Sequence, residues 1–387
     1  MSCPSADDEK VSTRVDVAIR GVRLAAPVRR TGGAGPSDDG HVVLGGLATA
    51  VPLRSDSPYL VRDGRLFRED RSRGPGAVTD VSLSDPSFID LGLSDLGLTD
   101  LDMDVAPVRR PAFYDLTTAD GTPYEKIAKL HGRDVLATTV VQTCSRYAPQ
   151  DRCRFCAIES SLEAGATTAV KTPAQLAEVA EAAARLDGVR HVVMTTGTST
   201  APDRGARHLA RCVRAVKAAV PHLRVQVQCE PPADLATLTE LHEAGADSIG
   251  IHVESLDDAV RRRWMPGKST VPLAEYRAAW AEAVRVFGRN QVSTYLLVGL
   301  GEDPDELVAG AEELVALGVY PFVVPFRPLA GTLAVDEDGA AAPAPAVLED
   351  VSRRVAKALR AGRMRGADQM AGCAACGACS VLQDLGA

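Results

Sequence analysis

Short apolar runs alternate with amphipathic stretches between residues 134 and 332 of the chain. The stretch 172–186 has apolar residues at helical spacing and opens with Thr172, Pro173 and Gln175, the pattern of a helix start with a capping box. This alternation predicts βα units around a parallel sheet. Because six units fall short of the eight in a closed barrel, we expect an α/β fold with a partial (β/α)6 barrel. The six predicted strands are 134–142, 189–197, 223–229, 247–253, 291–300 and 319–326.

The region before the predicted barrel is irregular and rich in strand-forming residues. Residues 15–24 and 42–53 are strand-like, and Asp63-Gly64 is a two-residue hairpin signal. Residues 83–104 repeat Asp and Leu with many acids, which is typical of an acidic linker. After the barrel, the pattern at 345–366 predicts a helix that leads to the segment CAACGAC. We therefore expect three parts: a β-rich region with its linker at 1–110, the barrel at 111–335, and a C-terminal helix with a cysteine-rich segment at 336–387.

Charge and apolar content exclude several classes of partner. The net charge is −8, and the basic residues are dispersed among acids instead of lining one face, so we expect no nucleic-acid partner. With 45% apolar residues the chain can bury a large core, but it has no run of eighteen apolar residues. The first thirty residues are charged and lack an apolar core of a signal peptide. We expect a cytoplasmic protein with no membrane partner.

The loop after the first predicted strand carries three cysteines. Cys144, Cys153 and Cys156 have the spacing C-x8-C-x2-C and belong to a total of nine cysteines. An odd number of thiols without a secretion signal indicates metal or redox chemistry in a reducing compartment. Structural zinc takes four nitrogen or sulfur ligands, whereas a [4Fe–4S] cluster held by three cysteines leaves one iron open to a further ligand. Zinc and an iron–sulfur cluster both remain possible from the spacing.

Several segments resemble radical S-adenosylmethionine (SAM) enzymes. VLATTVVQTC, RCRFCAIESSL, TTGT, VQCEPP, MPGK, YLLVGLGE and GVYPFVVPFRPLAGT look like the uncharacterised radical SAM family encoded in bacterial nitrilase-containing gene clusters. The barrel is more remotely similar to biotin synthase. The common spacing in the superfamily is C-x3-C-x2-C, so the eight residues between the first two cysteines are a departure.

The resemblance implies a [4Fe–4S] cluster on Cys144, Cys153 and Cys156, with SAM bound at its open iron. The resemblance also implies a role in SAM binding for eight further residues. Phe155, Gly299 and Gly301 would lie near the adenine, and Glu254 would bind the ribose. The backbone carbonyls of Thr196, Gly197 and Thr198 would bind the amino group, and Arg277 would bind the carboxylate. Candidates for the later proton or electron transfer are His252, Cys229, Tyr295 and Arg327, of which Arg327 also suits a substrate carboxylate. Without the resemblance, His252 fits a satisfied polar residue better than a functional one, and Cys229 is equally well a packing residue.

The cysteine-rich segment carries a second set, Cys373, Cys376 and Cys379, spaced C-x2-C-x2-C. This spacing favours an auxiliary [4Fe–4S] cluster, with structural zinc or redox cysteines as alternatives.

We therefore expect an oxygen-sensitive radical SAM enzyme of specialised metabolism. Reductive cleavage of SAM would give a 5′-deoxyadenosyl radical that takes hydrogen from a small nitrogen-containing metabolite, with electrons from a donor such as flavodoxin or ferredoxin. Three alternatives remain: transfer of the aminocarboxypropyl group of SAM, sulfur insertion from the auxiliary cluster, and a non-catalytic zinc-binding protein. The substrate itself is beyond the sequence.

Overall fold

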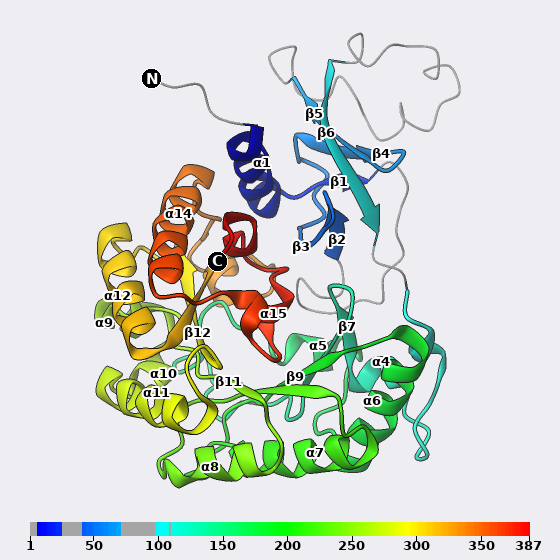
Figure 1. The fold of residues 1–387 in the computed structure, drawn as a ribbon, viewed down its shortest axis with the longest axis vertical. Helices are drawn as coiled ribbons and strands as arrows, with labels where there is room; N and C mark the ends of the chain where they lie inside the picture. Colours follow the sequence, from blue (N-terminus) through cyan, green and yellow to red (C-terminus); the bar gives the residue numbers. More distant parts are fainter. Residues whose placement is uncertain (1–5, 25–40, 71–96, 108–109) are drawn as a thin grey trace.

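The computed structural model describes residues 6–24, 41–70, 97–107 and 110–387. Cys3, the segment 25–40 and most of the predicted acidic linker lie outside these ranges. Within 110–387 the strands form one curled sheet in the order β13-β12-β11-β10-β9-β8-β7 (Figure 1). All neighbours pair in parallel except β7 and β8, which pair antiparallel. Their bounds are β7 Lys129–His131, β8 Val135–Thr139, β9 His191–Thr195, β10 Arg224–Gln228, β11 Ser248–Gly250, β12 Val292–Val298 and β13 Val319–Pro325.

The six predicted barrel strands are confirmed, and so is the mixed α/β fold with an open, partial barrel. Long helices cover the outer side of the curled sheet (Figure 1). The first of them, α6 Pro173–Asp187, starts at Thr172, whose hydroxyl accepts from the backbone of Gln175 while the Gln175 side chain accepts from the backbone of Thr172. The other helices of this outer layer are α7 Ala206–Ala219, α8 Ala236–Glu243, α11 Leu273–Phe287, α12 Pro304–Leu317 and α14 Pro345–Ala361, whereas the short helices α9 Asp258–Trp264 and α10 Pro266–Ser269 lie against the loop that follows β8.

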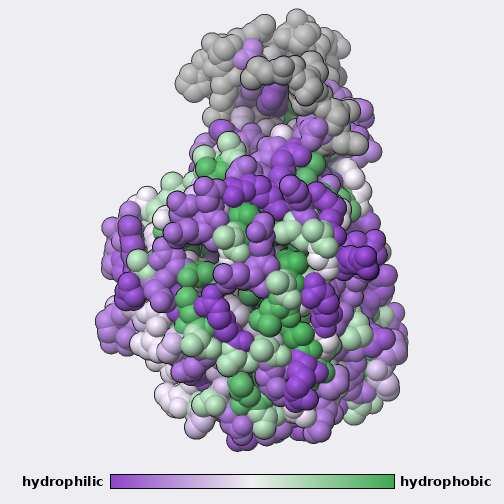
Figure 2. All heavy atoms as spheres, turned by 60° about the vertical axis from the view of Figure 1, so that its left-hand side comes forward, coloured by the Kyte–Doolittle hydropathy of each residue, from purple (hydrophilic) through white to green (hydrophobic). Residues whose placement is uncertain are grey.

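Short elements complete the barrel region. They are the 3-10 turns η3 Ala112–Asp115, η4 Gly366–Asp368 and η5 Leu382–Leu385, and the helices α4 Tyr124–Ile127, α5 Ser160–Glu163, α13 Leu333–Asp336 and α15 Cys373–Cys376. Apolar side chains of the strands and of the outer helices form the main core. Polar residues predominate on the face drawn in Figure 2, with smaller apolar areas between them. No helix in the described ranges is both long and apolar enough to span a bilayer.

The N-terminal part differs from its prediction in two places. Residues 15–20 continue the helix α1 Ala6–Arg20 and are not a strand; β1 Arg23–Leu24 has only two residues. Val11, Val15 and Ile19 recur at a spacing of four, which buries one face of the helix in the main core. Residues 98–104, expected in the acidic linker, lie in the strand β6 Leu98–Pro107. The alternation of Leu and Asp there is strand periodicity, with Met103 and Val105 buried in the small N-terminal core.

In the described part of residues 6–107, six strands form a second sheet in the order β1-β4-β5-β6-β2-β3. The hairpin predicted at Asp63-Gly64 is confirmed, because both residues have positive φ between two paired strands. The remaining strands are β2 His41–Leu44, β3 Leu47–Ala50, β4 Tyr59–Arg62 and β5 Arg65–Glu69.

The C-terminal segment after α14 runs along the open side of the barrel. The Ser248 hydroxyl donates to the Ala371 carbonyl over 2.9 Å, and the Gly372 amide donates to Nδ1 of His191 over 3.1 Å, so the segment lies against β9 and β11. It then joins the N-terminal sheet, where the Ala50 amide donates to the Ala378 carbonyl over 2.7 Å. The cysteine-rich segment thus connects the barrel with the N-terminal sheet.

Candidate functional site

The three cysteines of the first set lie in the loop that leaves β8. Loop and barrel are joined by the Ser145 amide, which donates to the Thr198 carbonyl over 2.8 Å, and by the Cys144 amide, which donates to Oε1 of Glu159 over 3.3 Å. Burial raises the pKa of the Cys153 thiol well above its ordinary value, and burial with the nearby charge of Cys144 raises the pKa of Cys156 to about 11. Such thiols need a cation to hold them as thiolates.

The eight residues between Cys144 and Cys153 dock on the α9–α10 connection. The Gly267 amide donates to the Asp151 carbonyl over 2.8 Å, and a Cβ on Gly267 would lie 2.6 Å from that oxygen. The Arg146 guanidinium donates to the Gly267 carbonyl, and the Arg154 amide donates to the Trp264 carbonyl over 2.7 Å. The extra length of the loop therefore has a structural role: it carries an arginine into the mouth of the barrel.

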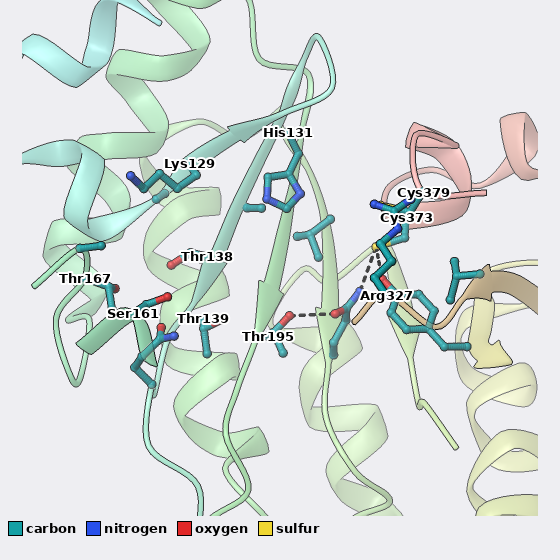
Figure 3. A pocket seen from close by; sticks show the side chains of 18 of the residues that line it. Lys129, His131, Thr138, Thr139, Ser161, Thr167, Thr195, Arg327, Cys373 and Cys379 are labelled. Atoms are coloured by element: carbon teal, nitrogen blue, oxygen red, sulfur yellow. Dashed lines mark hydrogen bonds between the residues drawn. The ribbon is translucent and has the colours of Figure 1, made fainter. Parts of the chain in front are cut away.

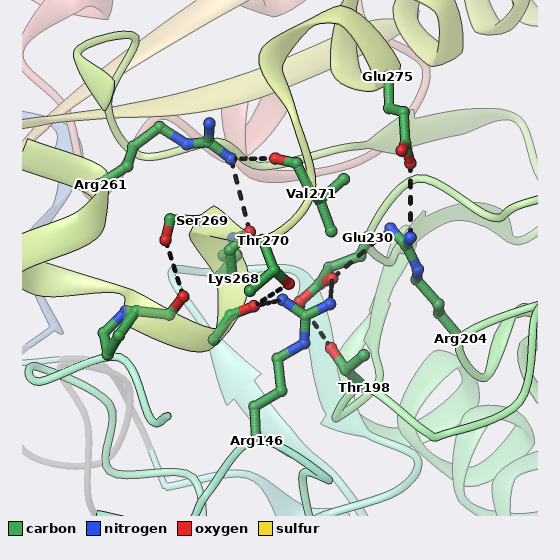
Figure 4. Close-up of polar contacts among 12 residues, drawn as sticks. Arg146, Thr198, Arg204, Glu230, Arg261, Lys268, Ser269, Thr270, Val271 and Glu275 are labelled. Carbon is green, nitrogen blue, oxygen red and sulfur yellow. Dashed lines mark hydrogen bonds and ion pairs between the residues drawn. The ribbon is translucent and has the colours of Figure 1, made fainter. Parts of the chain in front are cut away.

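Five buried or half-buried charged side chains on or beside this loop form what we call the ionic cluster: Arg146, Arg204, Glu230, Glu254 and Lys268. Figure 4 shows Arg146, Arg204, Glu230 and Lys268. Arg146 pairs with Glu230 over 3.1 Å, and Arg204 lies 3.8 Å from the same carboxylate. Lys268 pairs with Glu254 over 2.5 Å, with only 11% and 13% of the two side chains exposed. Burial lowers the pKa of Lys268, but the charge of Glu254 and other anionic neighbours outweighs burial and holds this pKa above its ordinary value.

Glu254 occupies an unusual backbone conformation. Its φ is +62°, the left-handed region that costs a residue with a Cβ about 1–2 kcal/mol. Its backbone is fixed there by hydrogen bonds with β12, because the Glu254 amide donates to the Tyr295 carbonyl and the Glu254 carbonyl accepts from the Leu297 amide. Strain that the surrounding structure maintains in this way is common at functional sites.

The stretch Thr196 to Thr198 lies directly beside the first cysteine. The Gly197 amide donates to the Val141 carbonyl over 2.8 Å, and a Cβ on Gly197 would lie 2.0 Å from the Thr143 carbonyl oxygen. Only glycine allows this approach of the two strand ends. The Thr198 hydroxyl donates to Oε1 of Glu230 over 2.9 Å, which joins this stretch to the ionic cluster.

Arg277, Gly299 and Gly301, which the resemblance implied for SAM binding, do not share one environment. Arg277 lies on the outer helix α11, 53% exposed and paired with Glu313 of α12 over 3.0 Å, so the structure does not bring it to the ionic cluster. The side of Gly299 on which a Cβ would project faces the ring of Pro343 at 3.0 Å, whereas the same side of Gly301 meets no atom within 4 Å. Arg146 and Lys268 are cations that the structure does bring to the ionic cluster.

A cavity of about 430 Å³ runs through the barrel interior (Figure 3). Phe155 of the cysteine loop lines it and also packs with Trp264 and Phe326. Cys373 and Cys379 of the second set line the same cavity. Figure 3 shows Thr138, Thr139, Ser161 and Thr167 on one side of the cavity and the two cysteines with Arg327 on the other. The cavity thus borders both Phe155 of the first cysteine loop and two cysteines of the second set.

The four candidate catalytic residues have different environments. The Tyr295 hydroxyl lines the cavity and donates to Sγ of Cys373 over 2.8 Å, while its ring stacks on His252 with centroids 3.9 Å apart. Burial lowers the pKa of His252 to about 3, and no described residue bonds to its Nε2. Cys229 packs in the main core, where burial raises its pKa to about 12. Arg327 donates to the Ala50 carbonyl over 3.0 Å and lines the cavity near Cys379.

The second cysteine set has polar partners of its own. Nε2 of Gln228 lies 3.4 Å from Sγ of Cys373, close to the Tyr295 hydroxyl that also donates there. A Cβ on Gly132, in the turn between β7 and β8, would lie 3.2 Å from Sγ of Cys376. The set therefore lies between the two edges of the open barrel, with Cys376 near the β7 edge and Cys379 near β13 and Arg327.

Each set brings three cysteines, the number that holds a [4Fe–4S] cluster with one iron left open. The eight cysteines that the structure describes are all free thiols. Among the described residues, no three His, Cys, Asp or Glu side chains are close enough together to hold one metal ion. A cubane cluster binds each thiolate through a different iron, so its ligands stand further apart than those of zinc.

Comparison with protein-family models adds a decisive match. Residues 143–314, which begin beside Cys144 and include the ionic cluster, match the Radical SAM superfamily. The chain carries a radical SAM domain. Its superfamily uses a [4Fe–4S] cluster and SAM, and the three-cysteine loop with neighbouring carbonyls and charges fits both groups. The narrower resemblance to the family of nitrilase-containing gene clusters stays a prediction.

Curated relatives of the radical SAM domain include two lipoyl synthases. That of Pyrobaculum calidifontis is 31% identical over 169 residues, which are 42% of this chain and 53% of the relative. That of Thermus thermophilus is 29% identical over 175 residues, 43% of this chain and 50% of the relative. The chain thus spans about half the length of these curated relatives.

Solved structures with a similar backbone fold include methylornithine synthase (PylB). It has a TM-score of 0.47 and 16% identity over 65% of this chain and 69% of that chain. The [FeFe]-hydrogenase maturase HydG from Carboxydothermus hydrogenoformans has a TM-score of 0.44 and 16% identity over 59% and 51% of the two chains.

Sequence reasoning missed several charged residues of the radical SAM domain. Glu230 follows directly after β10 and Cys229, so its position at a strand end was a usable signal. Lys268 stands in MPGK, a segment that carried the resemblance without a role for its lysine. Arg146 lay in the unexplained part of the cysteine loop, and Arg204 had no local signal.

Proposed function

We propose that this protein is a radical SAM enzyme acting on a small nitrogen-containing metabolite. The observation that carries the proposal is the loop of Cys144, Cys153 and Cys156, held beside the Thr198 carbonyl and the ionic cluster within the matched domain. With the cluster bound, reductive cleavage of SAM supplies methionine and a 5′-deoxyadenosyl radical that takes a hydrogen atom from the substrate.

Different residues of the site bind different groups of SAM. Thr196, Gly197 and Thr198 offer backbone carbonyls to the SAM amino group, and Glu254 offers a carboxylate to the ribose diol. Arg146 or Lys268, instead of Arg277, provides the cation for the SAM carboxylate.

Other side chains shape the reaction space. Phe155 lines the cavity on the side of the cysteine loop. His252 stays neutral at physiological pH because burial lowers its pKa to about 3, so it acts as a hydrogen-bonding group and not as a charged acid.

For the second set we propose an auxiliary [4Fe–4S] cluster on Cys373, Cys376 and Cys379. Its nearness to the cavity supports a second candidate function, sulfur insertion, since Cys373 and Cys379 line the space where substrate would bind. The relatives named lipoyl synthase agree with this candidate only over part of their length. We further propose a cytoplasmic location and a flavodoxin or ferredoxin as electron donor.

Anaerobic reconstitution tests the function. We expect a brown protein with about eight irons if both sets bind clusters, which releases 5′-deoxyadenosine from SAM under reducing conditions. Cys153→Ala should abolish this product, whereas the matched control Cys212→Ala, a buried cysteine of α7, should keep it.

Other products of the same assay decide between the alternatives. Methylthioadenosine would indicate aminocarboxypropyl transfer, and loss of sulfide with turnover would indicate sulfur insertion. A colourless protein loaded with zinc that leaves SAM intact would overturn the proposal.

A further inference from the structure

Lys171 is a buried lysine that the proposed chemistry does not use. It is 1% exposed, lies just before α6 and lines the cavity. Its backbone is held to the strand region by the Lys171 amide, which donates to the Val140 carbonyl over 2.9 Å. The side chain therefore projects from a fixed backbone into the barrel interior.

The amine of Lys171 has a neutral partner. Nζ donates to Oε1 of Gln142 over 3.0 Å, and Nε2 of Gln142 donates in turn to the Ile158 carbonyl over 2.8 Å. The second bond fixes the amide so that its oxygen faces the lysine. An ammonium has three donors, and among the described residues Gln142 supplies the one acceptor that Nζ contacts.

A buried ammonium without a counter-charge is costly. Burial lowers the pKa of Lys171 to about 7, and no neighbouring charge opposes this shift. By contrast, Lys268, whose side chain is 11% exposed, is held charged by Glu254. Unlike Lys268, Lys171 has no carboxylate partner among the described residues.

The described residues of the cavity wall include basic side chains but no acidic ones. Of the described residues that line it, none is Asp or Glu, whereas five are basic or imidazole side chains: Lys126, Lys129, His131, Lys171 and Arg327. Arg327 lies near Cys379, at the side where the second cysteine set brings negative charge. Thr139, Ser161 and Thr167 stand on the opposite side, with hydroxyls able to donate to an anion (Figure 3).

From these observations we infer that the substrate carries an anionic oxygen group, a carboxylate or a phosphate, which binds Lys171 as the counter-charge that the protein does not provide. This inference rests on the proposed function, since it takes the cavity lined by Phe155, Cys373 and Cys379 as the substrate site. The volume of about 430 Å³ limits the substrate to a small molecule.

Binding measurements on the reconstituted holoprotein test this inference without turnover. The probes are linear carboxylates of three to eight carbons, the primary amides and primary amines of the same lengths, and alkyl phosphates. Calorimetry and thermal shift are recorded for each probe. We expect the carboxylates or the alkyl phosphates to bind at least 10-fold tighter than the amides, and the stronger of the two identifies the anionic group.

Three variants locate the effect. Lys171→Met should weaken anion binding roughly 10- to 100-fold and leave amide binding unchanged. Gln142→Glu keeps the lysine but gives it an internal counter-charge, so it should remove the preference for anions to a similar extent. Lys357→Met, on the outer helix α14, is the matched control and should bind as the wild type does.

Equal responses to anions, amides and amines, including no response to any of them, would overturn the inference, and so would undiminished anion binding by both Lys171→Met and Gln142→Glu. Failure of this test leaves 5′-deoxyadenosine formation from SAM intact, whereas failure of the proposed function abolishes that product while the anion preference can persist. The two results are therefore distinguishable.

Discussion

Single residues decide whether the SAM site can form, and Gly197 is the sharpest case. A methyl group there would lie 2.0 Å from the Thr143 carbonyl oxygen, so the strand end and the cysteine loop would have to separate. We expect Gly197→Ala to destabilise the protein by about 1–3 kcal/mol and to lower the iron bound by the first cysteine set. Denaturant unfolding and iron analysis measure the two effects.

The control for this variant is Gly301→Ala. Gly301 has a φ of +97° but no atom within 4 Å of its Cβ position, so the substitution brings backbone strain without a clash. It should cost about 1–2 kcal/mol and leave the iron content unchanged. Equal iron contents in the two variants would mean that the close approach at Gly197 has no bearing on the cluster loop.

At the level of single residues, the candidate site was predictable where its residues directly follow a predicted strand. The cysteines, Phe155 and Thr196 to Thr198 follow strand ends, and the structure places them there. Arg277 was placed by its offset from a motif, which cannot tell the inner side of the barrel from the outer face of a helix. The ion pairs of Arg146 and Lys268 join residues from separate loops, so no local pattern marks them.

Among the elements, the long cysteine loop departs most from the common spacing. Its docking on the α9–α10 connection brings Arg146 to Glu230, within the ionic cluster. If Arg146 contacts the SAM carboxylate, Arg146→Gln should weaken SAM binding by about 10- to 100-fold, which equilibrium binding to the reconstituted protein measures. Arg152→Gln is a control from the same loop, since Arg152 lies over the ring of Tyr147. Unaltered SAM affinity in Arg146→Gln would show that the loop serves only to position the cysteines.

Element types were predictable wherever periodicity is strong. The six strands of the barrel and the capping box of α6 follow from local patterns alone. In the N-terminal part, the apolar residues of 15–20 fit both a strand and a helix, and packing on the main core decides for the helix. Residues 98–104 looked like part of a linker because Asp recurs at short intervals, yet the strand β5 pairs with them.

For the molecule as a whole, buried histidines predict sensitivity to acid. Burial lowers the pKa of His131 to about 4 and of His252 to about 3, and it also lowers the pKa of His191. The unfolded chain therefore takes up protons first as the pH falls below about 6.5, and each histidine lowers the free energy of unfolding by up to about 1.4 kcal/mol per pH unit. Asp384 acts in the opposite direction, because burial raises its pKa to about 6.

Thermal unfolding between pH 7.5 and 5 checks this expectation. Stability should be greatest above about pH 6.5 and fall towards pH 5. His252→Gln removes one titrating group but keeps an acceptor for the Tyr295 amide, which donates to Nδ1 over 3.2 Å. The variant should lose stability less steeply, and parallel curves for variant and wild type would contradict the assignment.

The association of distant segments was the part that the sequence could not predict. Gln383 donates to the Ala48 carbonyl from 335 positions away, and Arg14 forms a buried ion pair with Asp384 over 3.0 Å. No periodicity or motif signals which turn of the C-terminal segment meets which edge of the N-terminal sheet, because the partners are chosen by shape and charge in three dimensions.

The contact between Ala48 and Gln383 also has a consequence for synthesis on the ribosome. At roughly 5–20 residues per second, Gln383 is made roughly 17 to 67 s after Ala48, given the 335 positions between them. During that interval the edge of the N-terminal sheet near Ala50 lacks its partner Ala378, and the side of the nascent barrel is open. Slow translation before residue 370 would therefore prolong the exposure of this edge, and a chaperone that shields it would limit wrong pairing.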